Sequence, residues 1–310
     1  MKRALFLAPH LDDVALSATK ACLQLRQEGF EIHVATIFSD DKAEAISKND
    51  STPWTKTTAT TRKDEDNEAC SRLQAKCIHV DMLDAPFRHS RYKNLKELLF
   101  FYKQDEKKTL TEVVAKIDDL IQTLQPDKVF APLGIGWHVD HQIVFEAVRQ
   151  LADRLGANKF YFYEDRPYAM MKYATDLRLA ELGYQKSPSP LRTKAILILK
   201  SIVFMKEFFG LEMNKSLLKT PTDKILISFY LLAKLSRLVA KPVAQTEWPQ
   251  SQLFLGNQKD LETASEIAQT YRSQFPYLFM SPGHFSLRSQ YYAKLLNPKS
   301  VYCERIWLLR

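Results

Sequence analysis

The sequence predicts an α/β protein: a Rossmann-like, doubly wound and mostly parallel sheet with helices on both faces, plus a helical insert. Two observations predict this fold class. Short apolar runs alternate with helical segments through the first half of the chain, the pattern of right-handed βαβ units. The runs are apolar at nearly every position, as in strands covered on both faces. The expected strands are ALFLA (4–8), EIHVATIF (31–38), CIHV (77–80), KVFAPL (128–133) and FYFYE (160–164).

The helical segments between these strands end at stop signals that have a steric basis. Gly29 and Gly156 follow the last periodic residues of two segments, and Pro126 follows a third. The expected helices cover residues 13–28, 60–73, 110–124 and 141–155.

The chain is predicted to divide into three parts: an α/β core over 1–186, a basic apolar helical insert over 187–250, and C-terminal elements over 251–310 that complete the core. Residues 191–245 carry ten Lys or Arg against three acidic residues. Two interpretations of this stretch stay open. It is either a pair of interfacial helices that contact a membrane surface, or a helical subdomain or oligomer contact with its lysines on the solvated face. We favour the second.

The composition is that of an ordinary globular protein, with 45% hydrophobic and 26% charged residues. The net charge of +8 favours anionic partners, but the basic residues are spread along the chain without a nucleic-acid-binding motif. We expect no nucleic-acid partner. The four cysteines lack CxxC spacing, which predicts reduced thiols in a cytoplasmic protein. No apolar run reaches the ~18 residues of a membrane span, so any membrane contact is expected to be peripheral.

Two polar clusters follow two of the expected strands. PHLDDVALS (9–17) brings His10, Asp12 and Asp13 directly after the first strand. Either aspartate alone is most simply explained as a helix N-cap. The second cluster stands in GIGWHVDHQIVFEA (134–147), after the strand at 128–133. Ligands of open α/β sheets bind at the carboxyl ends of strands where the strand order reverses. With the order 3-2-1-4-5, both clusters would face one crevice.

The residue types of the two clusters indicate a metal site. A catalytic zinc takes three His or Asp/Glu ligands and leaves one position open for water. His10 and Asp13 can converge on one ion, and His141 from the neighbouring strand end can complete the triad.

The three remaining polar residues of the clusters suit acid–base work. Asp12 would take a proton as water attacks a carbonyl group. His138, protonated and held by Asp140, would stabilise the resulting oxyanion and help to protonate a leaving amine.

The two motifs resemble those of the PIG-L/LmbE-like N-acetylglucosamine deacetylases. PHLDDVALS is similar to the first motif of the P-H-L-D-D subgroup, and WHVDH to the family's second motif. The resemblance implies a zinc-dependent hydrolase that removes acetyl from an N-acetylglucosaminyl group. It also implies the same roles by motif position: zinc ligands His10, Asp13 and His141, general base Asp12, oxyanion-stabilising His138 and its partner Asp140.

Further stretches extend the resemblance to about residues 1–170 and 255–310. TRKDEDNEACSRL (61–73) is similar to the family's R-x-x-E-D helix, and DAPFR (84–88) and YEDRPYA (163–169) to segments of the subgroup. YRSQFP (271–276) and ERIW (304–307) match near the end of the chain. The basic insert is unmatched. Gly136 stands where some relatives carry a mobile tyrosine, so oxyanion help from that position is not expected.

Four residues are candidates for binding a sugar or an anionic group: Arg62, Arg88, Arg166 and Trp54. The simpler explanation of Arg62 and Arg166 is a scaffold pair with a nearby carboxylate, Glu65 and Asp165 respectively. The function predicted first is zinc-dependent de-N-acetylation of an N-acetyl amino sugar in a glycan or glycoconjugate. Two alternatives stay open: a catalytically silent glycan- or nucleotide-binding α/β module, and an amidase for a different N-acyl group.

Overall fold

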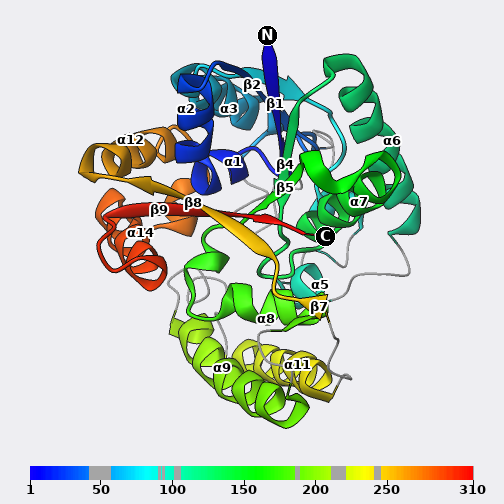
Figure 1. The fold of residues 1–310 in the computed structure, drawn as a ribbon, viewed down its shortest axis with the longest axis vertical. Helices are drawn as coiled ribbons and strands as arrows, with labels where there is room; N and C mark the ends of the chain where they lie inside the picture. The colour runs from blue at the N-terminus through cyan, green and yellow to red at the C-terminus, as the bar shows by residue number, and fades with distance from the viewer. Residues whose placement is uncertain are drawn as a thin grey trace.

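The predicted fold class is confirmed. The structure, a computed structural model, describes residues 1–41, 57–89, 92, 95–100, 106–185, 189–210, 221–240 and 246–309. Its main sheet has seven strands in the order β3-β2-β1-β4-β5-β9-β8 (Figure 1). The first five strands are parallel, and β9 and β8 continue the sheet antiparallel to their neighbours. The strands are β1 Lys2–Ala8, β2 Phe30–Thr36, β3 Lys76–His79, β4 Lys128–Pro132, β5 Phe160–Tyr163, β8 Gln250–Gly256 and β9 Tyr302–Leu308, with a separate pair β6 Tyr184–Gln185 and β7 Thr246–Glu247.

Helices cover both faces of the sheet, as Figure 1 shows with α2, α3 and α12 on one side and α6 and α7 on the other. Strand β1 shows why its sequence is apolar throughout: Leu5 and Leu7 pack into one core, and Phe6 into the other. The helices are α1 Asp13–Ser17, α2 Thr19–Gln27, α3 Ala59–Leu73, α4 Ala85–Arg88, α5 Leu95–Phe100, α6 Lys107–Leu124, α7 Val139–Leu155, η4 Ala157–Lys159, η5 Tyr168–Met170, α8 Ala174–Glu181, α9 Pro190–Gly210, α11 Pro221–Ala240, α12 Gln258–Ala268, α13 Phe275–Leu278 and α14 Pro282–Leu296.

The single helix expected over 13–28 is wrong, because the structure has two helices that meet at Ala18. The buried carboxylate of Glu304 on β9 accepts the backbone N–H groups of Lys20 and Ala21, each at 2.9 Å. Glu304 therefore satisfies free donors in the first turn of α2, which allows a new helix to begin there. The C-terminal strands thus share a sheet and a helix cap with the first half of the chain. The domain boundaries themselves stay a prediction.

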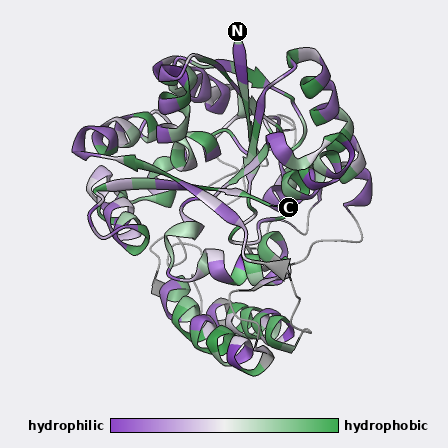
Figure 2. Cartoon of the chain, in the orientation of Figure 1, coloured by the Kyte–Doolittle hydropathy of each residue, from purple (hydrophilic) through white to green (hydrophobic). Residues whose placement is uncertain are grey.

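Helices α9 and α11 pack against each other and lie at one end of the molecule (Figure 1). Their inner side chains, such as Phe204 and Leu231, join the main core. Figure 2 shows that both helices carry many hydrophobic residues along their length. The exposed large apolar side chains there are Leu191, Ile196, Ile198, Leu199, Ile202, Ile225, Phe229 and Leu232. Among the described residues, no helix is long and apolar enough to cross a membrane.

Candidate metal centre

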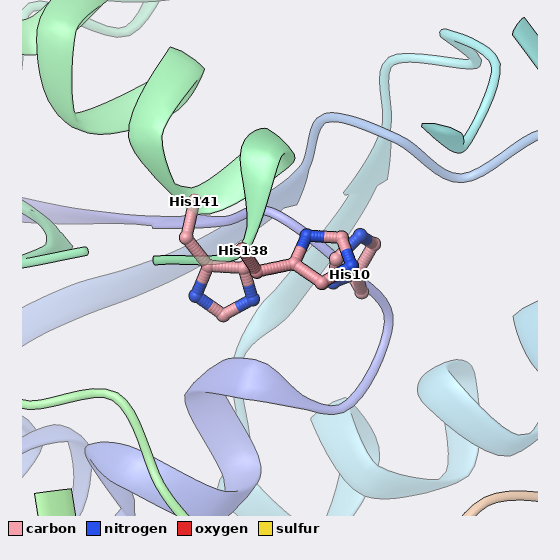
Figure 3. Close-up of side chains that lie close together, drawn as sticks. All are labelled: His10, His138 and His141. Atoms are coloured by element: carbon pink, nitrogen blue, oxygen red, sulfur yellow. The ribbon is translucent and has the colours of Figure 1, made fainter. Parts of the chain in front are cut away.

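The structure brings the two predicted polar clusters together, because β1 and β4 are neighbours. We call the six residues the His10 cluster; they are His10, Asp12, Asp13, His138, Asp140 and His141. The imidazoles of His10, His138 and His141 gather at the start of α7 (Figure 3), and one ring nitrogen of each lies within 4.8 Å of the others. The prediction that both strand ends face one site is therefore correct in its geometry.

Asp13 lies between the two histidines that were predicted as its co-ligands. Its Oδ2 is 3.5 Å from His10 Nδ1, and its Oδ1 is 3.4 Å from His141 Nε2. Tetrahedral ligands at ~2.0–2.1 Å from a zinc ion stand about 3.3–3.4 Å apart. The backbone N–H of His10 also donates to Asp13 Oδ2 at 2.7 Å, which holds the carboxylate in place. Asp13 therefore contacts both histidines, one through each carboxylate oxygen, and the assignment of these three residues as ligands of one ion stays a prediction.

Each of these two histidines has a second carboxylate on its other ring nitrogen. His141 Nδ1 lies 2.6 Å from Asp165 Oδ1, and the backbone N–H of Ile135 donates to the other oxygen of Asp165. His10 Nε2 lies 3.1 Å from Asp140 Oδ2. Metal-binding histidines usually donate their free N–H to such a group, which fixes the tautomer and the ring orientation. The surroundings of His10 and His141 are therefore those of metal ligands.

Asp12 stands at the N-cap position of α1, yet its side chain makes no capping hydrogen bond. The simpler explanation of this residue as a helix cap is therefore not supported. Asp12 is buried, and burial together with the neighbouring Asp13 carboxylate raises the pKa of Asp12 to about 6. A carboxylate with this pKa suits a general base, because catalytic pKa values lie near the working pH.

His138 differs from its expected state. Its Nδ1 accepts the backbone N–H of Asp140 at 3.2 Å, so the side chain caps α7. Two effects lower the pKa of His138 to about 3: burial, which is the larger, and the positive charge of His10. The imidazole is therefore neutral, and since Nδ1 is an acceptor, Nε2 carries the hydrogen. The Asp140 carboxylate, which was expected to hold His138, instead faces His10, the backbone N–H of Ala85 and Arg88. The role of His138 in stabilising an oxyanion stays a prediction.

The charge balance of the site favours a cation. Burial lowers the pKa of His10, but Asp84, Asp13 and Asp140 outweigh burial and raise it well above its usual value. His141 likewise has a raised pKa, because Asp13 and Asp165 outweigh burial. Without a metal, protons on these two imidazoles compensate the carboxylates. A divalent ion would take over that charge, and its binding would release protons.

Comparisons with known proteins agree with this geometry. Residues 5–152 match the sequence model of the PIG-L family, described as GlcNAc-PI de-N-acetylase. This part of the chain is therefore similar to the PIG-L family. The predicted resemblance is confirmed. A search of curated protein sequences finds no match.

Solved structures share the fold over nearly the whole chain. The A40926 pseudoaglycone deacetylase Dbv21 has a TM-score of 0.62 at 17% identity, covering 99% of this chain and 96% of its own. The zinc-inhibited form of teicoplanin deacetylase Orf2 has a TM-score of 0.62 at 18% identity, with 99% and 97% covered. The conserved protein TT1542 from Thermus thermophilus has a TM-score of 0.50 at 15% identity, with 99% and 94% covered. The shared fold therefore extends beyond residues 5–152 and through the C-terminal elements.

The arginines predicted to contact the substrate have clear partners. Arg166 donates to the Tyr302 hydroxyl and the Cys303 carbonyl, so the suggested pair with Asp165 does not form. Arg62 pairs with Asp84 at 3.3 Å, whereas Glu65 binds Ser273, so the suggested Arg62–Glu65 pair does not form. Among the described residues, the buried Nε of Arg62 has no hydrogen-bond partner.

The guanidinium of Arg88 is buried against Asp140 and Glu106 and lies over the Phe38 ring. It contacts Asp140 from behind and thereby orients the carboxylate that faces His10. Its predicted role in substrate binding stays a prediction, as does that of Trp54, which lies outside the described residues.

Sequence reasoning missed two carboxylates of this site and one phenol. Asp84 Oδ1 lies 3.6 Å from His10 Nε2, and Asp165 orients His141. Both follow parallel strands, β3 and β5, at the same edge as the two motifs, and that position was the available signal. The third is Tyr168, whose ring fills the space beside Gly136: a Cβ there would approach the ring to 2.2 Å.

Proposed function

We propose that this protein is a metal-dependent deacetylase that removes the acetyl group from an N-acetyl amino sugar, of the N-acetylglucosaminyl type, in a glycan or glycoconjugate. The observation that carries the proposal is Asp12, a buried carboxylate that caps nothing and stands beside the His10–Asp13–His141 donor set. The PIG-L match supports this class of reaction. The neighbours described as deacetylases of a pseudoaglycone and in teicoplanin biosynthesis support a glycoconjugate substrate.

We propose zinc as the metal, with His10, Asp13 and His141 as its ligands. Two imidazoles and one carboxylate form a common ligand set of catalytic zinc, with one position left open. When bound, such an ion polarises a carbonyl oxygen and makes water more acidic. Asp140 and Asp165 would keep the two imidazoles oriented. Arg88 would hold the Asp140 carboxylate in position, and Asp84 would do the same for the Arg62 guanidinium.

The chain's own residues account for the proton movements of amide hydrolysis. Asp12 accepts a proton from the attacking water. His138 donates a hydrogen bond from Nε2 to the acetyl oxygen as negative charge develops on it, which a neutral imidazole can do. The proton collected by Asp12 then passes to the sugar nitrogen as the C–N bond breaks. The products are a free amine and acetic acid, which keeps the second proton of the water and releases it to solvent as acetate forms, so all atoms are accounted for.

Arg62 is the candidate for contact with the sugar. Its guanidinium reaches Asp84 beside His10 and retains a buried N–H without a partner in the described part of the chain. A hydroxyl or carbonyl oxygen of the substrate would satisfy that donor. This assignment keeps Arg62 in its predicted role.

The test is a screen of acetate release with the zinc-loaded protein, with and without a chelator. The substrates are free N-acetylglucosamine, an N-acetylated chitobiose, glycopeptides that carry N-acetylglucosamine, and the same compounds with longer acyl chains. We expect chelator-sensitive acetate release from at least one N-acetylglucosaminide and none from the Asp12→Asn variant. Release of a longer acyl group alone would instead support the amidase alternative. Binding without turnover of any compound would support a silent module.

A further inference from the structure

A second group of metal-ligating side chains lies apart from the His10 cluster, between α3 and the edge strand β3. We call it the Asp66 cluster: Asp66, Cys70, Cys77 and His79. Ligand atoms of Asp66, Cys70 and Cys77 lie within 4.8 Å of one another. His79 Nε2 is 2.9 Å from Asp66 Oδ2 and 3.3 Å from Cys77 Sγ. Four donors of three chemical types therefore meet at one place.

The local structure explains why these four side chains converge. Asp66 and Cys70 are four residues apart on α3 and therefore share one helix face, while Cys77 and His79 are two apart on β3 and share one strand face. The helix face is buried, with Asp66 and Cys70 almost inaccessible. The strand residues are partly accessible, and 16% of the His79 side chain is exposed. An ion could enter from this side.

The two distances from Cys77 Sγ match those of a tetrahedral site, and the 2.9 Å from His79 Nε2 to Asp66 Oδ2 would have to lengthen when an ion binds. Zinc bonds of ~2.0–2.3 Å to nitrogen, oxygen and sulfur place neighbouring ligands about 3.3–3.8 Å apart. The distance from Cys77 Sγ to Asp66 Oδ2 is 3.4 Å, and that from Cys77 Sγ to His79 Nε2 is 3.3 Å. All four cysteines are free thiols, so Cys70 and Cys77 are available as thiolate ligands. Only small movements are needed to accommodate an ion.

We propose that the Asp66 cluster binds a second metal ion of the zinc type, with a structural role. Two thiolates, one imidazole and one carboxylate suit zinc and do not suit calcium or magnesium, which prefer oxygen ligands. The protein would fill all four positions and leave none for substrate, as in structural zinc sites. The other oxygen of Asp66 accepts the Tyr271 hydroxyl at 2.6 Å, which anchors this ligand to the C-terminal part of the chain.

The position of the site indicates what the metal would do. Strand β3 has only four residues and lies at the edge of the sheet, where one neighbour alone holds it. An ion bound by residues of both α3 and β3 would hold this edge strand against the helix. Arg62, Asp66 and Cys70 follow one another at four-residue spacing along α3, so the same ion would fix the helix that brings Arg62 to Asp84.

Metal counting on the zinc-loaded protein tests the proposal. We expect two zinc ions per chain in the wild type and one in the Cys77→Ser and His79→Gln variants, both of which alter partly exposed residues. Cys22→Ser changes a buried cysteine outside the cluster and should keep both ions. Cobalt substitution should give a thiolate-to-metal charge-transfer band that Cys77→Ser removes and His141→Ala retains. The band therefore reports on this site independently of the proposed deacetylase activity.

Three results would overturn the proposal. The first is a single zinc per chain in the wild type with no thiolate band. The second is a metal content that the Cys77→Ser variant does not change. The third is a Cys70–Cys77 disulfide, seen as a mass difference on reduction in protein that was never exposed to chelator, which would make the pair a redox element instead.

Discussion

The His10 cluster and the Asp66 cluster are assembled from the same elements, the ends of strands and the faces of helices, yet they differ in what surrounds the donors. In the His10 cluster each metal-facing imidazole has a second carboxylate behind it, and Asp12 is left over as a buried carboxylate without a capping partner. In the Asp66 cluster the ligand atoms contact one another, and Asp66 also accepts the Thr36 hydroxyl at Oδ2 and the Tyr271 hydroxyl at Oδ1.

This difference separates a reaction centre from a structural one. A group that must exchange protons with a substrate has to be free of other partners, whereas a structural ligand set is stable when every position is filled. The residue types of the ligands alone do not show which of the two clusters is the reaction centre. Asp12, which makes no capping hydrogen bond, is what distinguishes them, and the experiments below ask whether this carboxylate carries the activity.

Loss of Asp12 should have the largest effect. In Asp12→Asn we expect kcat for acetate release to fall by ~10²–10⁴-fold, because a positioned general base contributes about that much. Zinc content should stay at the wild-type value, since Asp12 is not among the proposed ligands. The exposed Asp153→Asn on α7 is the matched control. A variant that lost its zinc together with its activity would place Asp12 among the ligands.

The second effect concerns the carboxylate behind His141. Asp165→Asn should weaken metal binding at the His10 cluster by about 10–100-fold, because an amide orients and polarises the imidazole less well than a carboxylate. Competition with a chromophoric chelator measures this change. The thiolate band of the cobalt protein should not move. Unchanged metal affinity would mean that Asp165 serves the fold alone.

The third effect is a shift of the pH profile. The rate should fall as the pH drops through the pKa of Asp12, about 6 before any metal is bound and lower beside a cation. Arg62 lowers that pKa because its positive charge favours the carboxylate. In Arg62→Met the pKa of Asp12 should rise, so the acid limb of kcat/KM should move to higher pH. Arg62→Lys keeps the positive charge and should leave the acid limb of kcat/KM at its wild-type pH. If the acid limb does not shift when the charge at position 62 is removed, Asp12 is excluded as the titrating base.

Much of the fold follows from the sequence because its signals are local. The five parallel strands begin and end within a few residues of their predicted ranges, since a strand buried on both faces must be apolar throughout, as Leu5 and Phe6 illustrate. The break at Ala18 was not predictable in this way. Glu304, which caps α2, lies 284 residues from Lys20 along the chain, and no local pattern reports such a contact.

The candidate site was likewise predictable only where the signals are local. The six residues of the two motifs could be placed together because each motif follows a strand and the strand order makes those strands neighbours. The partner of each carboxylate could not be predicted. Asp165 stands next to Arg166 in sequence but binds His141, and Asp140 follows His138 closely but its carboxylate faces His10 and Arg88. Hydrogen-bond direction depends on side-chain rotamers and on elements distant in sequence.

The smallest effect is expected at the outer face of α9 and α11, the part of the molecule least like either cluster. Replacing Leu199 and Phe229 with serine changes two exposed side chains, which typically alters the free energy of unfolding by ~0.5 kcal/mol or less per site. Acetate release from a small water-soluble substrate should therefore match the wild type.

Vesicle flotation then decides between the two interpretations of this face. If the lysines of these helices serve only a solvated surface, the wild type should stay unbound with neutral and with anionic vesicles alike, and that is the outcome we expect. Flotation with anionic vesicles that the Leu199→Ser, Phe229→Ser variant abolishes would contradict it, because peripheral binding requires both buried apolar area and attraction to anionic headgroups. Such a result would add a third functional region to the two clusters, one built from surface composition and not from converging side chains.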